Sequence, residues 1–258
     1  MKRNNIVYLL IIIFITLGCD NEDFFELERP PQFPWQSPSD MEFGISGVYN
    51  KTFLDDWNNP VGNNYLIFIG LSDHTQLLPE TNADISYNEL YNRITQVRLA
   101  ETTPSFTANY DAIGICNQGL DFYQSFNYRP FQGESTPDQR RSMNRIMGEY
   151  YFMRAYNYWH LALRHLPKPG DPAFDDLELI PKRIRFPTSK QEAVNAPFMG
   201  GKETFEIILS DLDSAMKYLP ESYRAGIDDD SYEFGRANLY AARFLAMEVH
   251  FYLGGEAE

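Results

Sequence analysis

The chain has 258 residues and a mass of 30.0 kDa, and its 22 Lys and Arg against 36 Asp and Glu give a net charge of −14. This acidic balance argues against nucleic acid and against an anionic membrane surface as partners, because both attract clustered Lys and Arg. Two cysteines and four dispersed histidines predict neither a disulfide framework nor a His/Cys zinc site, so no metal or other cofactor is expected.

The first 18 residues have the pattern of a secretory leader. Lys2 and Arg3 precede an unbroken apolar run, residues 6–15, which is shorter than the about 18 residues that a bilayer-crossing helix needs. Cys19 follows a glycine, at the place where bacterial lipoprotein processing attaches lipid to the thiol. We therefore predict that residues 1–18 are a signal peptide and that Cys19 is lipidated. An ordinary leader cleaved elsewhere is the alternative.

Residues 19–38 are first acidic and then rich in proline. This composition predicts an extended tether that leads away from a lipid anchor. The acids directly after Cys19 are Asp20, Glu22 and Asp23. They resemble the export tag of lipoproteins on the outer face of some outer membranes, and they are equally typical of a solvated tether.

Apolar residues at helical spacing predict six helices in the rest of the chain. These cover about 40–53, 85–98, 107–127, 137–163, 205–219 and 237–253. The first is expected to be capped by Ser39 or Asp40. The clearest start signal is Thr136, followed by Pro137 in the first turn and by Gln139, which can complete a capping box.

The predicted helix from Pro137 is apolar or aromatic nearly all round, which indicates a central helix packed on several sides. The sequence contains no strand pattern of comparable strength. The fold class is therefore predicted to be all-α, with helical hairpins of a tetratricopeptide-like type and long irregular loops.

Residues 55–84 form a predicted loop that is rich in Asn, Asp, Gly and Pro around a short apolar run. Loops of this length in compact domains are usually functional or disordered, and aromatic residues, which make up 15% of the chain, favour function here. Sugar recognition needs flat apolar faces together with planar amide or carboxylate groups. The candidate ligand-binding residues are Trp57, Asn63, Asn64, Tyr65 and Asp73. For each ring, packing at the edge of the core is an equally good explanation.

No set of residues indicates catalysis or metal binding. Asp73 and His74 lie near Glu80 and Asp84, but turn-forming acids in a hydrated loop explain them better than a glycosidase carboxylate pair does. The run Asp228–Asp230 lacks the ligand spacing of a calcium-binding loop and is expected to form a solvated turn.

Four polar residues of the predicted helices have structural explanations. Arg154 lies on the aromatic helix, so we expect it to bond to an acid or to carbonyls of a neighbouring helix. His160 and His165 are five residues apart and do not share a helix face, which argues against a two-histidine metal site. Cys116 lies on an apolar stripe and is predicted to be a small buried hydrophobe.

Four stretches of the mature chain carry a resemblance to a known family. They are Leu27–Pro30 with Gly47–Tyr49, Tyr110–Asn117, Gly148–Trp159, and Ile208–Pro220 with Gly235–Ala237. Together they resemble the SusD/RagB family of outer-membrane nutrient-binding lipoproteins. The third stretch is the most specific, because it is similar to the family's Gly-Glu-Ala, Leu-Arg-Ala and aromatic sequence on one helix.

The resemblance implies a lipid-anchored protein of the outer membrane that faces the cell exterior. Such a protein would bind an oligosaccharide or similar nutrient and deliver it to a TonB-dependent transporter, without catalysis. Two alternatives stay open: a helical-repeat scaffold that binds another protein, and a lipid-anchored glycoside hydrolase. A hydrolase would need a placed pair of carboxylates, whereas a scaffold would not need the aromatic, Asn-rich loop.

The chain departs from the family pattern in two places. Members usually end the aromatic helix with Phe-Gly-x-x-Pro, whereas Arg164–Pro167 has no glycine, so another way of ending is expected. Members are also much longer, so residues 39–258 are expected to form only the amino-terminal helical domain. On that expectation, the helices near 137–163 and 236–253 expose apolar surface that the rest of the protein would cover.

Overall fold

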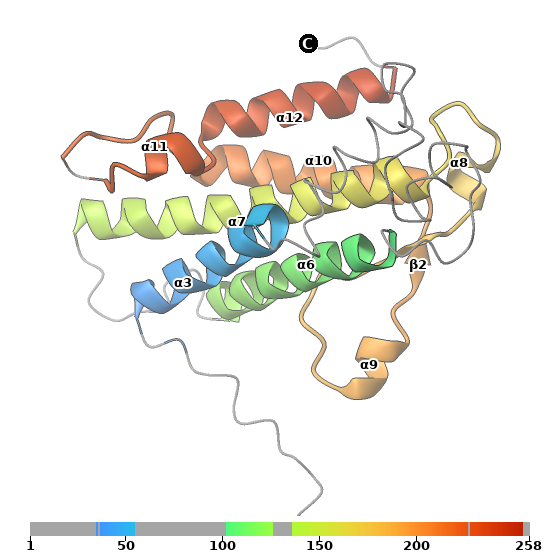
Figure 1. The fold of residues 1–258 in the computed structure, drawn as a ribbon, viewed down its shortest axis with the longest axis horizontal. Coiled ribbons are helices and arrows are strands. Elements are labelled where there is room, and N and C mark those ends of the chain that lie inside the picture. Colours follow the sequence, from blue (N-terminus) through green and yellow to red (C-terminus); the bar gives the residue numbers. More distant parts are fainter. Residues whose placement is uncertain (1–34, 36, 55–101, 126–135, 227, 255–258) are drawn as a thin grey trace, which may run out of the picture. The chain divides into compact units, whose positions relative to one another are not determined.

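The protein was analysed as a computed structural model that describes residues 35, 37–54, 102–125, 136–226 and 228–254. From Ser37 onward these residues belong to one compact unit, which is almost wholly helical, as the sequence predicts (Figure 1). Its elements are α3 (Pro38–Tyr49), the π-helical turn η1 (Asn50–Leu54), α6 (Thr102–Ser125), α7 (Pro137–His165), α8 (Ala173–Asp176), β1 (Ile180–Pro181), α9 (Lys190–Val194), β2 (Phe198–Met199), α10 (Gly201–Tyr218), α11 (Tyr232–Gly235) and α12 (Leu239–Tyr252). The all-α class is confirmed.

The long helices α3, α6, α7, α10 and α12 lie where apolar spacing predicts helices. The predicted helix 85–98 lies outside the described residues. The start of α3 differs from the expectation: its N-cap is Ser37, with Pro38 in the first turn, and neither Ser39 nor Asp40 is the cap. Asp40 still contributes, because its Oδ2 accepts a hydrogen bond of 2.9 Å from the N–H of Ser37.

Both ends of α7 follow from local chemistry. The predicted capping box is confirmed: Thr136 Oγ1 accepts from the N–H of Gln139, and Gln139 Oε1 accepts from the N–H of Thr136, each at 3.2 Å. At the other end Leu166 leaves the helix in an extended conformation, with φ −96° and ψ 148°. The residue before a proline avoids helical geometry, so Pro167 ends α7 without the family's glycine.

α7 is the central helix of the unit. It packs against α6 and α10, and also against α3 and, less extensively, α12 (Figure 1). Tyr150 and Tyr158, on its middle turns, are fully buried. The expectation that this helix exposes apolar surface is therefore wrong, because its neighbours already cover it on several sides.

Two glycines allow these helices to approach each other closely. A Cβ on Gly148 would lie 2.8 Å from the backbone nitrogen of Leu219, at the end of α10. A Cβ on Gly119 of α6 would lie 2.7 Å from the ring of Tyr150. Any larger residue at these positions would push α10 or α6 away from α7.

The segment between α7 and α10 is irregular and holds only short elements. Its strands pair antiparallel, with Ile180 opposite Met199 and Pro181 opposite Phe198. No helix among the described residues is long and apolar enough to cross a membrane.

Candidate functional site

The residues that the sequence singles out for binding and anchoring lie outside the described part of the chain. They are Cys19, Trp57, Asn63, Asn64, Tyr65 and Asp73, and the possible acids of the same loop, Glu80 and Asp84, lie there too. What the structure shows is the helical frame on either side of the predicted loop, with η1 before it and α6 after it. Two buried polar clusters hold this frame together.

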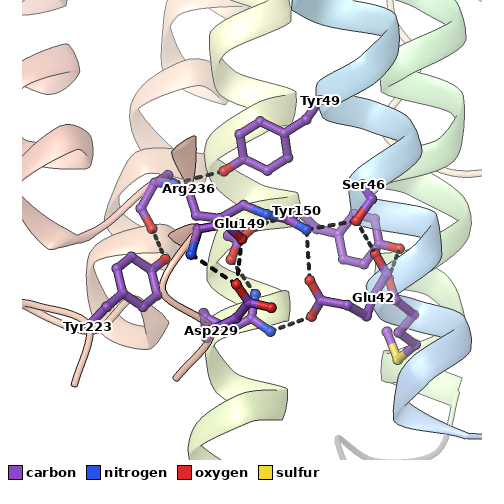
Figure 2. Close-up of polar contacts among 12 residues, drawn as sticks. Glu42, Ser46, Tyr49, Glu149, Tyr150, Tyr223, Asp229 and Arg236 are labelled. Carbon is purple, nitrogen blue, oxygen red and sulfur yellow. Dashed lines mark hydrogen bonds and ion pairs between the residues drawn. The ribbon is translucent and has the colours of Figure 1, made fainter. Parts of the chain in front are cut away.

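The first cluster is a ring of four charges between α3, α7 and the end of α11 (Figure 2). Arg236 donates from Nη2 to Glu42 at 2.8 Å and from Nη1 to Glu149 at 2.9 Å. Arg145 pairs with the same two acids, bonding Glu149 Oε1 at 2.5 Å and also contacting Glu42. Each carboxylate therefore meets both guanidinium groups, and charges of opposite sign alternate around the ring. We call these four residues the charge ring.

Tyrosine rings enclose the charge ring. The guanidinium carbon of Arg145 lies 4.5 Å from the ring centre of Tyr232, and that of Arg236 lies 4.8 Å from the ring centre of Tyr49. These distances fall within the range of cation–π attraction. The hydroxyl of Tyr49 also accepts a 2.9 Å hydrogen bond from the N–H of Ala237, as Figure 2 shows. The two rings cover part of the guanidinium groups, while the side chain of Glu42 stays 23% exposed.

Burial and charge pairing have opposite effects on the pKa values of the charge ring. Glu149 is fully buried, which raises the pKa of its carboxyl, while Arg145 and Arg236 limit that rise. Burial alone would lower the pKa of Arg145, but the carboxylates of Glu149 and Glu42 outweigh it and raise that pKa. The charge ring therefore acts as an ionic tie between α3, α7 and α11.

The charge ring was not predicted from the sequence. Glu149 and Arg236 lie in stretches that carry the family resemblance, whereas Glu42 and Arg145 belong to none of the predicted sites. A usable signal was present, because Arg145 and Glu149 have opposite charges and are four residues apart, so they share one face of the helix.

The second cluster centres on Arg154, as predicted. Its guanidinium holds Asp211 of α10 through two hydrogen bonds of 2.8 and 2.7 Å, and it donates to the Asn117 side chain at 2.8 Å and to the Ile184 carbonyl at 3.1 Å. Burial raises the pKa of Asp211, and Arg154 opposes that rise. The cluster joins α6, α7 and α10 to the segment after β1.

An open polar cleft of ≈ 430 Å³ lies over this second cluster. Besides Arg154 and Asp211, its lining includes Gln124 of α6, Glu206 of α10 and the half-exposed segment around Arg185. Acids, bases and an amide dominate the lining, and none of its residues is aromatic. Sugar binding relies on flat apolar faces, and the aromatic rings that would supply them are absent from the lining of this cleft.

Cys116 is buried, whereas His160 and His165 of α7 are half-buried. Cys116 is fully buried, as predicted, and burial raises the pKa of its thiol. Burial, with help from Arg164, lowers the pKa of His160 to about 4 and lowers that of His165 as well. Within the described ranges, no three His, Cys, Asp or Glu side chains are placed to share a metal ion.

The aspartate run after residue 227 forms a turn, as predicted. Asp229 accepts hydrogen bonds from the N–H and the hydroxyl of Ser231, at 2.9 and 2.6 Å. Asp228 forms an ion pair with Arg141 at 3.1 Å. These local contacts explain the acids without a bound cation.

Comparison with known proteins identifies one family. Residues 50–242 match the family model described as SusD-like, "Starch-binding associating with outer membrane". No match was found among curated proteins.

Several solved structures share the fold. A SusD-like carbohydrate-binding protein from Bacteroides vulgatus is 19% identical to this chain, with a TM-score of 0.63. The match covers 85% of this chain and 42% of that protein. A SusD superfamily protein from Bacteroides fragilis is 23% identical with a TM-score of 0.64, covering 85% and 47%. A laminarin-binding SusD-like protein is 16% identical with a TM-score of 0.61, covering 85% and 41%. The chain thus spans less than half the length of these proteins.

Proposed function

Since the chain belongs to the SusD-like family, we propose that it binds an oligosaccharide or a similar nutrient at the outer membrane, without catalysis. The observation that carries this proposal is the family match over residues 50–242, because it includes the whole aromatic, Asn-rich loop. The fold it shares with the laminarin-binding protein supports a glycan as the ligand.

The described residues show how the start of the predicted loop is held. Thr52, just before the loop, accepts a 3.2 Å hydrogen bond from the side chain of Asn157 on α7. The ring of Phe53 packs against Tyr156, with ring centres 5.5 Å apart. Residues 52 and 53, which precede the predicted loop, are therefore fixed against the central helix.

We assign ligand contacts within the loop to Trp57, Asn63, Asn64, Tyr65 and Asp73. Replacing Trp57 by Ala should weaken binding of laminarin or starch oligosaccharides about tenfold or more, through loss of the stacking face. The matched control is Phe43→Ala, which removes an exposed ring from α3 and should leave the affinity unchanged. Equal affinity in both variants would remove Trp57 from the site.

We also propose that the chain is anchored through lipid on Cys19 after removal of residues 1–18, with residues 19–38 as a tether, and faces the cell exterior. In this position it would deliver its ligand to a TonB-dependent transporter. Cells grown with labelled palmitate should label the protein, and Cys19→Ala should abolish both the label and membrane fractionation. A label that persists in this variant would refute the anchor.

The hydrolase alternative gains no support from the described carboxylates. Glycoside hydrolysis uses one carboxyl as an acid and another as a base or nucleophile, facing the same bond. The two most buried acids, Glu149 and Asp211, each bond to arginine and belong to different clusters. We propose instead that residues 39–258 are the amino-terminal helical domain of a longer binding protein, whose remaining part completes the ligand surface.

A further inference from the structure

The segment between β1 and β2, residues 182–197, forms a lobe that projects from the helical bundle and carries α9 (Figure 1). Residues 182–191 contain four of the 22 Lys and Arg of the chain and no acid, although the chain has a net charge of −14. These cations are Lys182, Arg183, Arg185 and Lys190. The lobe therefore concentrates positive charge on an otherwise acidic protein.

A cleft of ≈ 310 Å³ opens in this lobe, and we call it the lobe cleft. Its lining includes three cations, Lys182, Arg183 and Arg185, and a single acid, Glu192. The cleft over Arg154 shares two of these cations, but four acids line it as well. A cleft lined mainly by one sign of charge attracts ions of the opposite sign. The lobe cleft, and not the cleft over Arg154, therefore favours an anion.

Lys182 and Glu192 already have partners outside the lobe cleft. Lys182 Nζ donates to Glu203 Oε1 of α10 at 2.6 Å. Glu192 Oε2 accepts from the N–H and the hydroxyl of Thr188, at 2.8 and 2.9 Å. These hydrogen bonds, together with the charge of Arg185, lower the pKa of the Glu192 carboxyl. The charges that are left for a ligand are those of the two arginines.

Neither arginine forms an ion pair with a carboxylate in the part of the chain that the structure describes. Arg183 donates from Nη2 to the carbonyl of Ala193, which is a neutral group. This contact leaves most of the N–H donors of its guanidinium available. Arg185 is exposed. A guanidinium binds a carboxylate through two parallel hydrogen bonds, so the two side chains offer a binding site for such a group.

The backbone that carries the arginines is fixed by side chains of the bundle. The carbonyl of Arg183 accepts from Asn117 at 2.7 Å and from the hydroxyl of Tyr158 at 2.9 Å. The N–H of Phe186 donates to Asp121 at 2.7 Å. Little backbone order then has to be gained when a ligand binds, which favours affinity.

The rest of the lining indicates what kind of anion fits. Ile184, Pro187 and Pro197 supply apolar surface, and Asn195 supplies an amide that can bond to a hydroxyl. An inorganic ion would leave both unused. A sugar acid has a carboxylate for the arginines, hydroxyls for the amide and ring C–H groups for the apolar surface. The lining therefore matches all three kinds of group on such a sugar.

We infer that the lobe cleft is a second binding site, separate from the aromatic loop, and that it takes the carboxylate-bearing sugar of an acidic glycan. Arg183 and Arg185 would bind the carboxylate. The inference rests on the proposed function, because that proposal makes the ligand a sugar.

Titration calorimetry of the protein with oligogalacturonate and with oligoglucuronate tests this inference. Each acid is compared with its own methyl ester, which keeps the sugar skeleton and removes the charge. We expect saturable binding of at least one acid, at least about tenfold tighter than that of its ester. Inorganic phosphate and sulfate are titrated at the same ionic strength and should bind more weakly than the acid, because they do not contact the apolar surface.

Two charge-matched variants locate the binding. Arg185→Gln should weaken binding of the acid about tenfold or more. Lys190→Gln removes the same charge from an exposed residue of α9 that does not line the lobe cleft, and it should leave the affinity within about twofold, because exposed charges are screened. Arg185 is exposed, so both variants should keep the thermal midpoint of the unchanged protein.

Three results would overturn the inference: equal affinity of the two variants for the acid, an ester that binds as tightly as the acid, or phosphate or sulfate that binds as tightly as the acid. Laminarin and starch oligosaccharides are titrated alongside. Binding of these neutral glycans without binding of either acid would reject the lobe cleft and keep the proposed function. If the acid binds but its affinity falls in Trp57→Ala and not in Arg185→Gln, the acid occupies the loop, which also rejects the lobe cleft. Failure of both the neutral and the acidic glycans to bind would reject both proposals.

Discussion

α7 and α12 are both rich in aromatic residues, yet their rings lie in opposite surroundings. Tyr150 and Tyr158 of α7 are fully buried, because other helices lie on several sides of it. Phe244 and Phe251 of α12 are more than half exposed, because the unit covers only the inner face of that helix. A helix that is rich in aromatic residues is therefore not always buried. Its rings are buried only where neighbouring elements pack on the face that carries them.

The two helices should differ most in the free energy of unfolding that is lost when one aromatic ring is removed from each. Trp159 of α7 is 7% exposed and packs against Tyr252, with ring centres 5.2 Å apart. Trp159→Ala should lower the free energy of unfolding by roughly 3–5 kcal/mol, because it leaves a cavity. Phe251→Ala, the matched change on α12, should change it by less than about 0.5 kcal/mol in the 258-residue chain. Urea denaturation measures both, and equal losses would contradict the comparison.

The ionic contacts of α7 should contribute nearly as much to the free energy of unfolding as its aromatic rings do. Glu149→Gln keeps the shape of the side chain but leaves Arg145 and Arg236 short of a buried counter-charge, which should cost about 3 kcal/mol. The control is Glu203→Gln, which breaks the 2.6 Å pair with Lys182, where both side chains are at least one-third exposed. That loss should stay below about 1 kcal/mol. A small effect of Glu149→Gln would show that the charge ring is not a structural tie.

A smaller, pH-dependent effect is expected at the end of α7. The pKa of His160 is about 4 in the folded protein against 6.5 when unfolded, because burial opposes its charge. The unfolded chain therefore binds more protons between these values, and the His160 contribution to stability decreases as the pH falls from 6.5 to 4, by at most about 1.4 kcal/mol per pH unit. In His160→Gln this part of the pH dependence should disappear. Parallel stability–pH curves for the two proteins would contradict the assignment.

The smallest effect on stability should come from polar changes on the exposed face of α12, which carries Tyr240, Phe244, Met247 and Phe251. Phe244→Glu should alter the free energy of unfolding of the 258-residue chain by less than about 0.5 kcal/mol. It should nevertheless lower the binding of a hydrophobic dye and the self-association seen by light scattering, because it interrupts the apolar patch. Phe43→Glu, at a ring on α3 that is 75% exposed, is the control. If both variants reduce dye binding equally, the exposed face of α12 does not bind the dye more than other exposed rings do.

Sequence patterns predicted the long helices because each has a clear apolar period or a cap, as with Thr136 and Gln139 at the start of α7. They did not predict α8, α9, α11 or the β1–β2 pair. These elements are two to five residues long, too short for periodicity to show. The sequence did not predict how α7 ends, because the family's glycine is absent. In the structure the helix ends at the residue before Pro167.

Pairings between distant residues were harder to predict than burial. The sequence predicted that Arg154 bonds to an acid or a carbonyl. It did not predict that the partner is Asp211, which lies 57 residues away. The charge ring joins Glu42 to Arg236 across 194 residues. This contact forms because α3 and the end of α11 both contact α7. The ligand residues of the loop lie outside the described residues and stay predictions.

Titration calorimetry of the intact protein with laminarin and starch oligosaccharides tests the proposed function most directly. The ligand is recovered afterwards and sized by chromatography. We predict saturable binding of at least one neutral glycan, binding that is weaker by about tenfold or more in Trp57→Ala, and recovery of the glycan at its original length. Absence of binding to any of these glycans, or recovery of shortened products, would contradict the proposal of a glycan-binding protein without catalysis.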